Sequence, residues 1–112
     1  MTRPTGFSKV KYQERILNEL NNILRTQISD PRTKFVSLTH VELNKDNSVA
    51  KIYWNCFDFE TKGDSQVAIE GMAGRLRSKL SQILKLRHTP ELHFVYNSQD
   101  EDTQKIENLL KE

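Results

Sequence analysis

The chain has 112 residues, of which 36% are hydrophobic and 29% charged, and its formal net charge is +2. This length fits one ordinary domain and excludes a multidomain enzyme. The single cysteine, Cys56, excludes an internal disulfide and a zinc site built from several thiolates. We expect one domain that folds alone around a small core.

The distribution of apolar residues indicates neither a signal peptide nor a membrane span. Residues 1–7 lack the apolar centre of a signal peptide, and no window approaches the roughly 18 apolar residues of a membrane span. We therefore expect a cytoplasmic protein with no membrane partner.

The small net charge conceals two basic and two acidic parts of the chain. Residues 1–34 carry seven basic and three acidic side chains, and residues 75–89 carry five basic and no acidic ones. Residues 35–74 hold three basic against six acidic residues, and residues 98–112 hold two against five. Any interaction with a polyanion is expected to use the basic parts.

The first predicted element is an amphipathic helix that follows Ser8. Its apolar stripe recurs every three or four residues from Tyr12 to Ile28, and Ser8 is the predicted N-cap. Pro31 ends the helix, because proline has no amide hydrogen and disfavours a helical Asp30. Asp30 is expected to cap local amides, which is a structural role for the segment 30–32. The alternative is a functional role, in which Arg32 on a rigid turn contacts a phosphate or a protein.

Two strands are predicted next, over residues 35–43 and 48–57, joined by a turn at residues 44–47. In the second strand one face is apolar and the other wetter, and the apolar face consists of Ala50, Ile52, Trp54 and Cys56. A third strand is predicted over residues 92–96.

Two helices are predicted between the second and third strands. Val67, Ala68 and Met72 indicate the first, which is interrupted near Gly71 and Gly74. The second continues until Thr89-Pro90, and its apolar face consists of Leu76, Leu80, Ile83 and Leu84. Residues 98–112 form an acidic tail with a predicted short helix around Ile106, Leu109 and Leu110. The order α-β-β-α-α-β predicts an α+β fold, a three-stranded sheet with helices on one face.

The histidines do not form a catalytic or metal-binding motif. His40, His88 and His93 lie outside every recognisable pattern, and His40 and His93 fall in predicted strands, where a partly buried structural histidine is expected. The acidic run 100–102 is expected to be a solvated segment or the charged start of the last helix. We predict no catalytic residue, no metal and no cofactor, and hence no enzyme.

The exposed face of the third predicted helix is strongly basic. Arg75, Lys79 and Lys85 lie opposite its apolar face, with Arg77 at the border. A solvated helix face usually interleaves Glu with Lys, and this one has no acid. A surface for RNA phosphates is therefore favoured over a purely solvated face.

Gly71-Met72-Ala73-Gly74 matches the Gly-x-x-Gly pattern between the two helices. In KH domains such a loop holds the backbone of single-stranded nucleic acid, since glycines let phosphates approach main-chain amides. The alternative is a kink between helices packed too closely for side chains.

Four segments together resemble the bacterial ribosome-binding factor A family. They are residues 24–32 (LRTQISDPR), 36–43 (VSLTHVEL), 50–53 (AKIY) and 84–94 (LKLRHTPELHF), within a match from about Lys9 to Tyr96. The resemblance implies a type II KH-like fold and a non-enzymatic factor that binds free 30S subunits. It also implies a role in late maturation, including 5′-end processing of 16S rRNA, that is important in the cold. The family usually has Ala-x-Gly at the interhelical kink, where this chain has Met72-Ala73-Gly74.

We therefore predict a tail over residues 1–7, a KH-like RNA-binding domain over residues 8–97 and the acidic tail over residues 98–112. The expected partners of this monomer are the 30S subunit and 16S rRNA or its precursor. The predicted contacts to rRNA are Arg75, Arg77, Lys79, Lys85, Arg87, Lys9, Lys11 and Arg32. The alternatives are a basic protein-interaction module and a KH-type binder of single-stranded RNA outside ribosome assembly.

Overall fold

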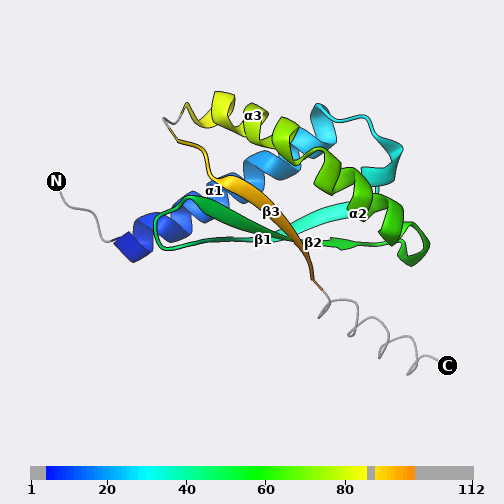
Figure 1. Cartoon of the computed structure of the whole chain (residues 1–112), viewed down its shortest axis with the longest axis horizontal. Coiled ribbons are helices and arrows are strands. Elements are labelled where there is room, and N and C mark those ends of the chain that lie inside the picture. The colour runs from blue at the N-terminus through cyan, green and yellow to red at the C-terminus, as the bar shows by residue number, and fades with distance from the viewer. Residues whose placement is uncertain (1–4, 86–87, 98–112) are drawn as a thin grey trace, which may run out of the picture.

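A computed structural model of the chain describes residues 5–85 and 88–97 (Figure 1). The helices are α1 (Thr5–Thr26), α2 (Lys62–Gly71) and α3 (Ala73–Leu84), the strands are β1 (Val36–Leu43), β2 (Val49–Cys56) and β3 (Glu91–Tyr96), and the short 3-10 turns are η1 (Pro31–Thr33) and η2 (Phe59–Thr61). The predicted order α-β-β-α-α-β is confirmed. Arg87 and the helix predicted in the acidic tail lie outside the described residues.

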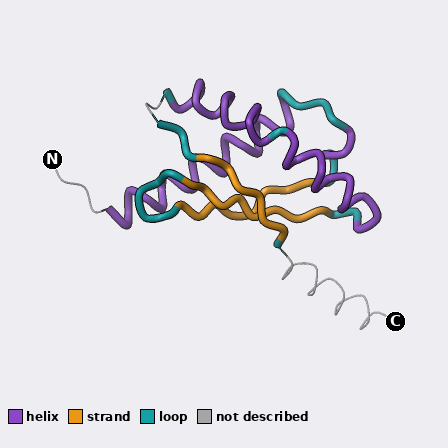
Figure 2. The backbone as a smooth tube through the Cα atoms, in the orientation of Figure 1, coloured by secondary structure: helices purple, strands orange, loops and turns teal. Residues whose placement is uncertain are grey.

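The three strands form one sheet in the order β1-β2-β3, and the helices cover one of its faces (Figure 2). β1 and β2 are antiparallel and β2 and β3 are parallel, with a bulge in β1 between Leu38 and His40. The core lies between sheet and helices, and its fully buried large side chains include Ile16, Leu20, Ile23, Ile52, Trp54, Ile69, Leu76 and Leu80. The predicted one-sided packing is therefore confirmed.

The strand alternation places the histidines on the open face of the sheet. The predicted apolar face of β2, from Ala50 to Cys56, is buried, while Lys51 on the other face is exposed. His40 pairs with Tyr53, and His93 pairs with Lys51, so both histidines lie on this open face and are exposed. The expectation of partly buried histidines was wrong, because strand parity and the β1 bulge turn them toward solvent.

Helix α1 begins earlier than the sequence indicates. It starts at Thr5, so Ser8 lies inside the helix and the prediction of Ser8 as N-cap was wrong. The stop at the other end is confirmed: the helix ends at Thr26, and Asp30 has extended backbone angles of φ −82° and ψ 119°. Between α1 and β1 the chain forms the 3-10 turn η1, and Pro31 is its first residue.

Helices α2 and α3 meet at the buried Met72, where the helical backbone is interrupted. Leu76, Leu80 and Leu84 are buried as predicted. Helix α3 ends at Leu84 because Lys85 adopts a left-handed conformation with φ 53°. The prediction that this helix extends to Thr89 was therefore wrong, and Lys85 lies at its end rather than on its basic face. In the described part of the chain, no helix is long and apolar enough to cross a membrane.

Candidate nucleic-acid interface

The turn η1 places a basic residue beside the end of α1. The Asp30 carboxylate accepts a hydrogen bond from the backbone N–H of Arg32 at 2.9 Å, so its predicted role as a local cap is confirmed. It also accepts three bonds from the Arg32 guanidinium, the shortest at 2.7 Å. This pairing lowers the pKa of Asp30 to about 2 and raises the pKa of Arg32, and Arg75 on α3 adds a smaller electrostatic effect on Asp30.

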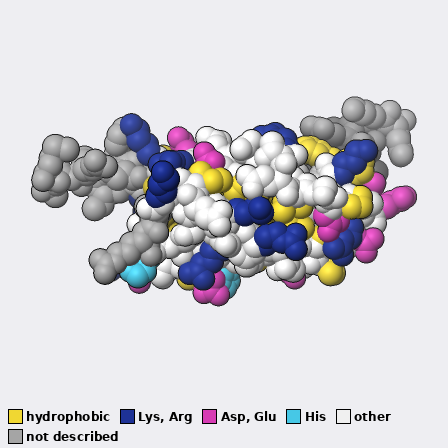
Figure 3. All heavy atoms as spheres, turned by 90° about the horizontal axis from the view of Figure 1, so that it is seen from above, with side chains coloured by type: hydrophobic (Ala, Val, Ile, Leu, Met, Phe, Trp, Pro, Cys, Tyr) yellow, Lys and Arg dark blue, Asp and Glu magenta, His cyan; other side chains and the backbone are white. Residues whose placement is uncertain are grey.

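Lys79 extends this cationic region along α3. Its ammonium donates a hydrogen bond to the Gln27 side chain at 3.1 Å, so Lys79 lies against the residue that follows α1. Arg75 lies one helical turn before Lys79 and is exposed. We call Arg32, Arg75 and Lys79 the basic surface. Figure 3 views the helical face and shows Lys and Arg side chains spread over it among apolar and acidic ones.

The other predicted contacts on and after α3 are not part of this basic surface. Arg77 donates two hydrogen bonds to the backbone carbonyl of Thr89, at 2.8 and 3.2 Å, which hold the segment that leads into β3. Arg77, Ser78 and His88 line a polar groove of about 510 Å³ beside that segment. Lys85 is exposed at the end of α3.

Two basic residues of the stretch 1–34 lie near the N-terminal end of α1, far from η1 along the helix. The Lys9 ammonium donates to the backbone carbonyls of Asn44 and Lys45, at 2.6 and 3.5 Å, in the turn between β1 and β2. Lys11 is exposed nearby on the same helix. The seven predicted contacts within the described residues thus fall into separate groups, of which Arg32, Arg75 and Lys79 lie together.

The Gly71–Gly74 junction is open rather than crowded. A Cβ atom added at Gly71 or Gly74 would meet nothing within 4 Å, so close packing of the helices does not explain these glycines. Neither glycine has a positive φ. Glu70 and Glu91 line the groove between this junction and β3. Two carboxylates oppose the binding of a phosphate there.

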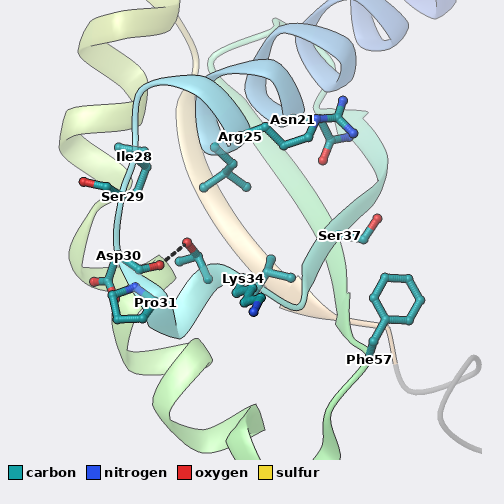
Figure 4. Close-up of a pocket in the computed structure, with 12 residues that line it drawn as sticks. Asn21, Arg25, Ile28, Ser29, Asp30, Pro31, Lys34, Ser37 and Phe57 are labelled. Atoms are coloured by element: carbon teal, nitrogen blue, oxygen red, sulfur yellow. Dashed lines mark hydrogen bonds between the residues drawn. The ribbon is translucent and has the colours of Figure 1, made fainter.

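A second group of cations lies in a groove that the sequence did not predict (Figure 4). It has a volume of about 510 Å³ and runs between the C-terminal half of α1, the chain from Ile28 to Lys34 and the start of β1. Arg25, Lys34 and Phe57 line it, and the Phe57 side chain is 66% exposed. The only signal in the sequence was an aromatic residue, Phe57, at the end of the strand predicted over residues 48–57.

The described residues contain no group of three or more side chains that could hold a metal ion. Cys56 is a buried free thiol whose sulfur lies 3.1 Å from the Asp58 carbonyl. His93 lies 3.5 Å from Glu91 on the open face of the sheet. The exposed cations of the described surface favour the binding of anions.

The element order, the parallel pairing of β2 with β3 and the one-sided helical layer define a KH-like domain. The family model described as "Ribosome-binding factor A" matches residues 8–110. The chain belongs to the ribosome-binding factor A family.

Curated members of this family match almost the whole chain. The ribosome-binding factor A of Heliobacterium modesticaldum is 38% identical over 108 residues, which cover 96% of this chain and 89% of that protein. The factor of Pelobacter propionicus is 35% identical over 103 residues, which cover 91% and 84%.

Solved structures share the fold. The crystal structure of ribosome-binding factor A from Thermus thermophilus has a TM-score of 0.70 at 25% identity, covering 79% of this chain and 94% of that one. The solution structure of a Thermotoga maritima protein has a TM-score of 0.71 at 28% identity, covering 85% and 91%. A homology model of the Thermus thermophilus factor, fitted into a cryo-EM map of a 30S–RbfA complex, has a TM-score of 0.69 at 23% identity, covering 81% and 97%.

Proposed function

We propose that this chain is a non-enzymatic factor that binds the free 30S subunit as a monomer and contacts 16S rRNA, or its precursor, in the cytoplasm. The observation that carries this proposal is the family membership, which a fitted relative in a 30S complex supports. The function assigned to the domain is assistance in late maturation of the subunit. It includes processing of the 5′ end of 16S rRNA and is needed most at low temperature.

The basic surface supports a contact with rRNA phosphates. Arg32, Arg75 and Lys79 come from two segments far apart in the sequence and meet at one side of the helical layer. Asp30 is already bonded to Arg32, and Asp64 adds a smaller electrostatic attraction to Arg32. Phosphate contacts of this kind position a protein without reading base sequence, so specificity would come from the shape of the immature subunit. Lys9, Lys11, Arg77, Lys85 and Arg87 remain proposed secondary contacts.

A phosphate clamp at Gly71–Gly74 is the less favoured route to RNA. The open space around both glycines would admit a backbone phosphate, as in a KH-type binder of single strands. Glu70 and Glu91 lie beside that space and repel a phosphate. We therefore assign the main contact to the basic surface and treat the glycine junction as a bend.

Sedimentation of cell extracts tests this function. The wild-type protein is expected to move with free 30S subunits and to be absent from translating ribosomes. A double variant, Arg75→Glu with Lys79→Glu, is expected to leave the 30S fraction because it reverses the charge of the basic surface. The matched control is Lys45→Glu with Lys51→Glu, which changes the net charge equally at exposed sites on the hairpin.

Two results would contradict the proposal. A wild-type protein that moves with no ribosomal particle removes the assembly function. A wild-type protein whose partners survive ribonuclease treatment of the extract supports a basic protein-interaction module instead. All four substituted side chains lie outside the core, so both double variants are expected to fold. Circular dichroism verifies this.

A further inference from the structure

The groove beside α1 has the size of a site for a small ligand. Its volume of about 510 Å³ lies within the range of about 300–1,000 Å³ that is usual for ligand sites. Asn21 and Arg25 border it from α1, Lys34 and Ser37 from the end of the chain before β1 and from β1 itself, and Phe57 from the chain that leaves β2 (Figure 4).

Phe57 is an exposed ring on a fixed backbone. Its N–H donates to the Phe35 carbonyl at 3.0 Å, which extends the β1–β2 ladder by one pair beyond Val36 and Cys56. The side chain is nevertheless 66% exposed, and the ring of Phe35 is 39% exposed. An aromatic ring held at the end of a sheet and left in water is available for stacking against a flat partner.

The charges at the groove favour an anion. Arg25 and Lys34 are exposed cations, and the Lys34 ammonium lies 5.6 Å from the centre of the Phe35 ring. Asp30 is the single carboxylate among the lining residues, and the Arg32 guanidinium already binds it. Asp58, which follows Phe57, accepts the backbone N–H of Glu60 at 3.1 Å.

The exposed Phe57 ring favours a flat ligand, and Arg25 and Lys34 favour a negatively charged one. A nucleotide has both properties. Hydroxyl groups of Ser29 and Ser37 also line the groove and can bond to a ribose or to a base edge. Figure 4 shows the chain from Ile28 to Lys34 between α3 and the groove, and Arg32 of the basic surface belongs to that chain. One RNA strand that crosses η1 would therefore meet the basic surface and then the groove.

We propose that this groove holds one unpaired nucleotide of a single-stranded RNA segment, with the base stacked on Phe57 and the adjacent phosphate bound by Arg25 and Lys34. The proposal rests on the function proposed above and adds a contact to a base, which the basic surface alone does not make. It also places the single-strand contact on the α1 side of the domain, away from Gly71–Gly74.

Binding of labelled decaadenylate and decauridylate to the full-length protein tests the groove by fluorescence anisotropy. Phe57→Ala is expected to weaken binding by roughly 5- to 150-fold, the equivalent of one lost base–aromatic stack. Phe57→Leu keeps an apolar side chain without a ring and should bind as weakly as Phe57→Ala. Phe57→Trp should bind at least as well as the wild type.

The matched control for these variants is Val67→Ala on α2. Val67 is 65% exposed, about as much as Phe57, and it lies outside the groove. Its substitution therefore removes exposed apolar surface without changing the proposed site. It should leave RNA affinity unchanged. The Phe57→Trp variant adds a direct readout, because Trp54 is 1% exposed and the new indole is the accessible one. Addition of either oligonucleotide should quench that fluorescence.

Three outcomes would overturn the nucleotide site. They are equal RNA affinity of wild type and Phe57→Leu, no quenching in Phe57→Trp, and loss of 30S binding in Phe57→Ala with unchanged affinity for both oligonucleotides. The last outcome would assign the groove to a protein of the subunit. Sedimentation of the Arg75→Glu, Lys79→Glu variant is a separate measurement, so the proposed function can stand when the groove fails.

Discussion

Asn21 on α1 and Leu38 on β1 exchange two hydrogen bonds across the edge of the sheet. The Asn21 side-chain amide donates to the Leu38 carbonyl at 3.0 Å, and the Leu38 N–H donates to the Asn21 side-chain carbonyl at 3.2 Å. The Gln13 side chain, two turns earlier on α1, accepts the N–H of Leu43 at 2.9 Å. The helix thereby supplies the partners that another strand would give to β1.

Substitution of Asn21 tests this edge contact. Asn21→Ala leaves a half-buried N–H and C=O of Leu38 without their partner, so we expect it to lower the free energy of unfolding by about 1–3 kcal/mol. Urea denaturation of the purified protein measures the change. Asn22→Ala is the control, because Asn22 is exposed on the next position of the same helix, and its effect should stay within about 0.5 kcal/mol. Equal effects of both variants would show that the Asn21 contact adds nothing.

The local patterns in the sequence were sufficient to predict the elements and the buried face. Alternation in β2 identifies Ala50, Ile52, Trp54 and Cys56 as inward, and these side chains are buried. Asn21 could not be recognised in this way. A polar residue on a helix gives no sign of whether its side chain meets water or the edge of a strand.

The errors have specific physical causes. Thr89-Pro90 is the first strong stop signal after Leu84 in the sequence, whereas Lys85 turns left-handed and ends α3 earlier. The β1 bulge shifts the strand parity, so a histidine within an apolar strand could not be assigned to a face. The groove joins Phe57 to the stretch from Asn21 to Ser37, and its form depends on how α1 lies against β1.

Helix α2 offers a matched pair of apolar residues for a test of the core. Ile69 is 0% exposed and Val67 is 65% exposed, two residues earlier on the same helix. Ile69→Ala should lower the free energy of unfolding by about 2–5 kcal/mol, since it leaves a cavity between helix and sheet. Val67→Ala should change it by no more than about 0.5 kcal/mol. Similar losses for the two variants would mean that α2 packs on the other face.

The pKa of Asp30 reports the pairing with Arg32. In the folded protein the bonds from the Arg32 guanidinium and from the Arg32 backbone N–H lower this pKa from 3.8 to about 2. The pKa of Asp30 is lower in the folded protein than in the unfolded chain. The stabilisation of the fold by the charged carboxylate is therefore complete above about pH 4 and is lost as the pH falls toward 2. Carbon-detected NMR titration should find the low value in the wild type and a higher pKa in Arg32→Gln, in which the backbone N–H of residue 32 still bonds to Asp30.

Asp46 is the internal control for that titration. Hydrogen bonds from the Ser48 hydroxyl and N–H lower the pKa of Asp46, and Arg32 takes no part in them. Its titration should therefore be the same in the wild type and in Arg32→Gln. If the Asp30 titration also stays unchanged, the ion pair seen in the structure does not persist in solution.

The salt dependence of RNA binding counts the phosphates that the cations contact. Four to five contacts, from the basic surface together with Arg25 and Lys34, should give a slope of log affinity against log salt of about −3 to −4.5. Arg75→Gln should reduce the size of that slope by about 0.7–0.9, because one contact is lost. Lys51→Gln, which removes an exposed cation from the open face of the sheet, should leave the slope unchanged. Filter binding of 16S rRNA over a series of potassium chloride concentrations measures all three slopes. A wild-type slope near zero, or equal reductions in the two variants, would remove the basic surface as the site of phosphate contact.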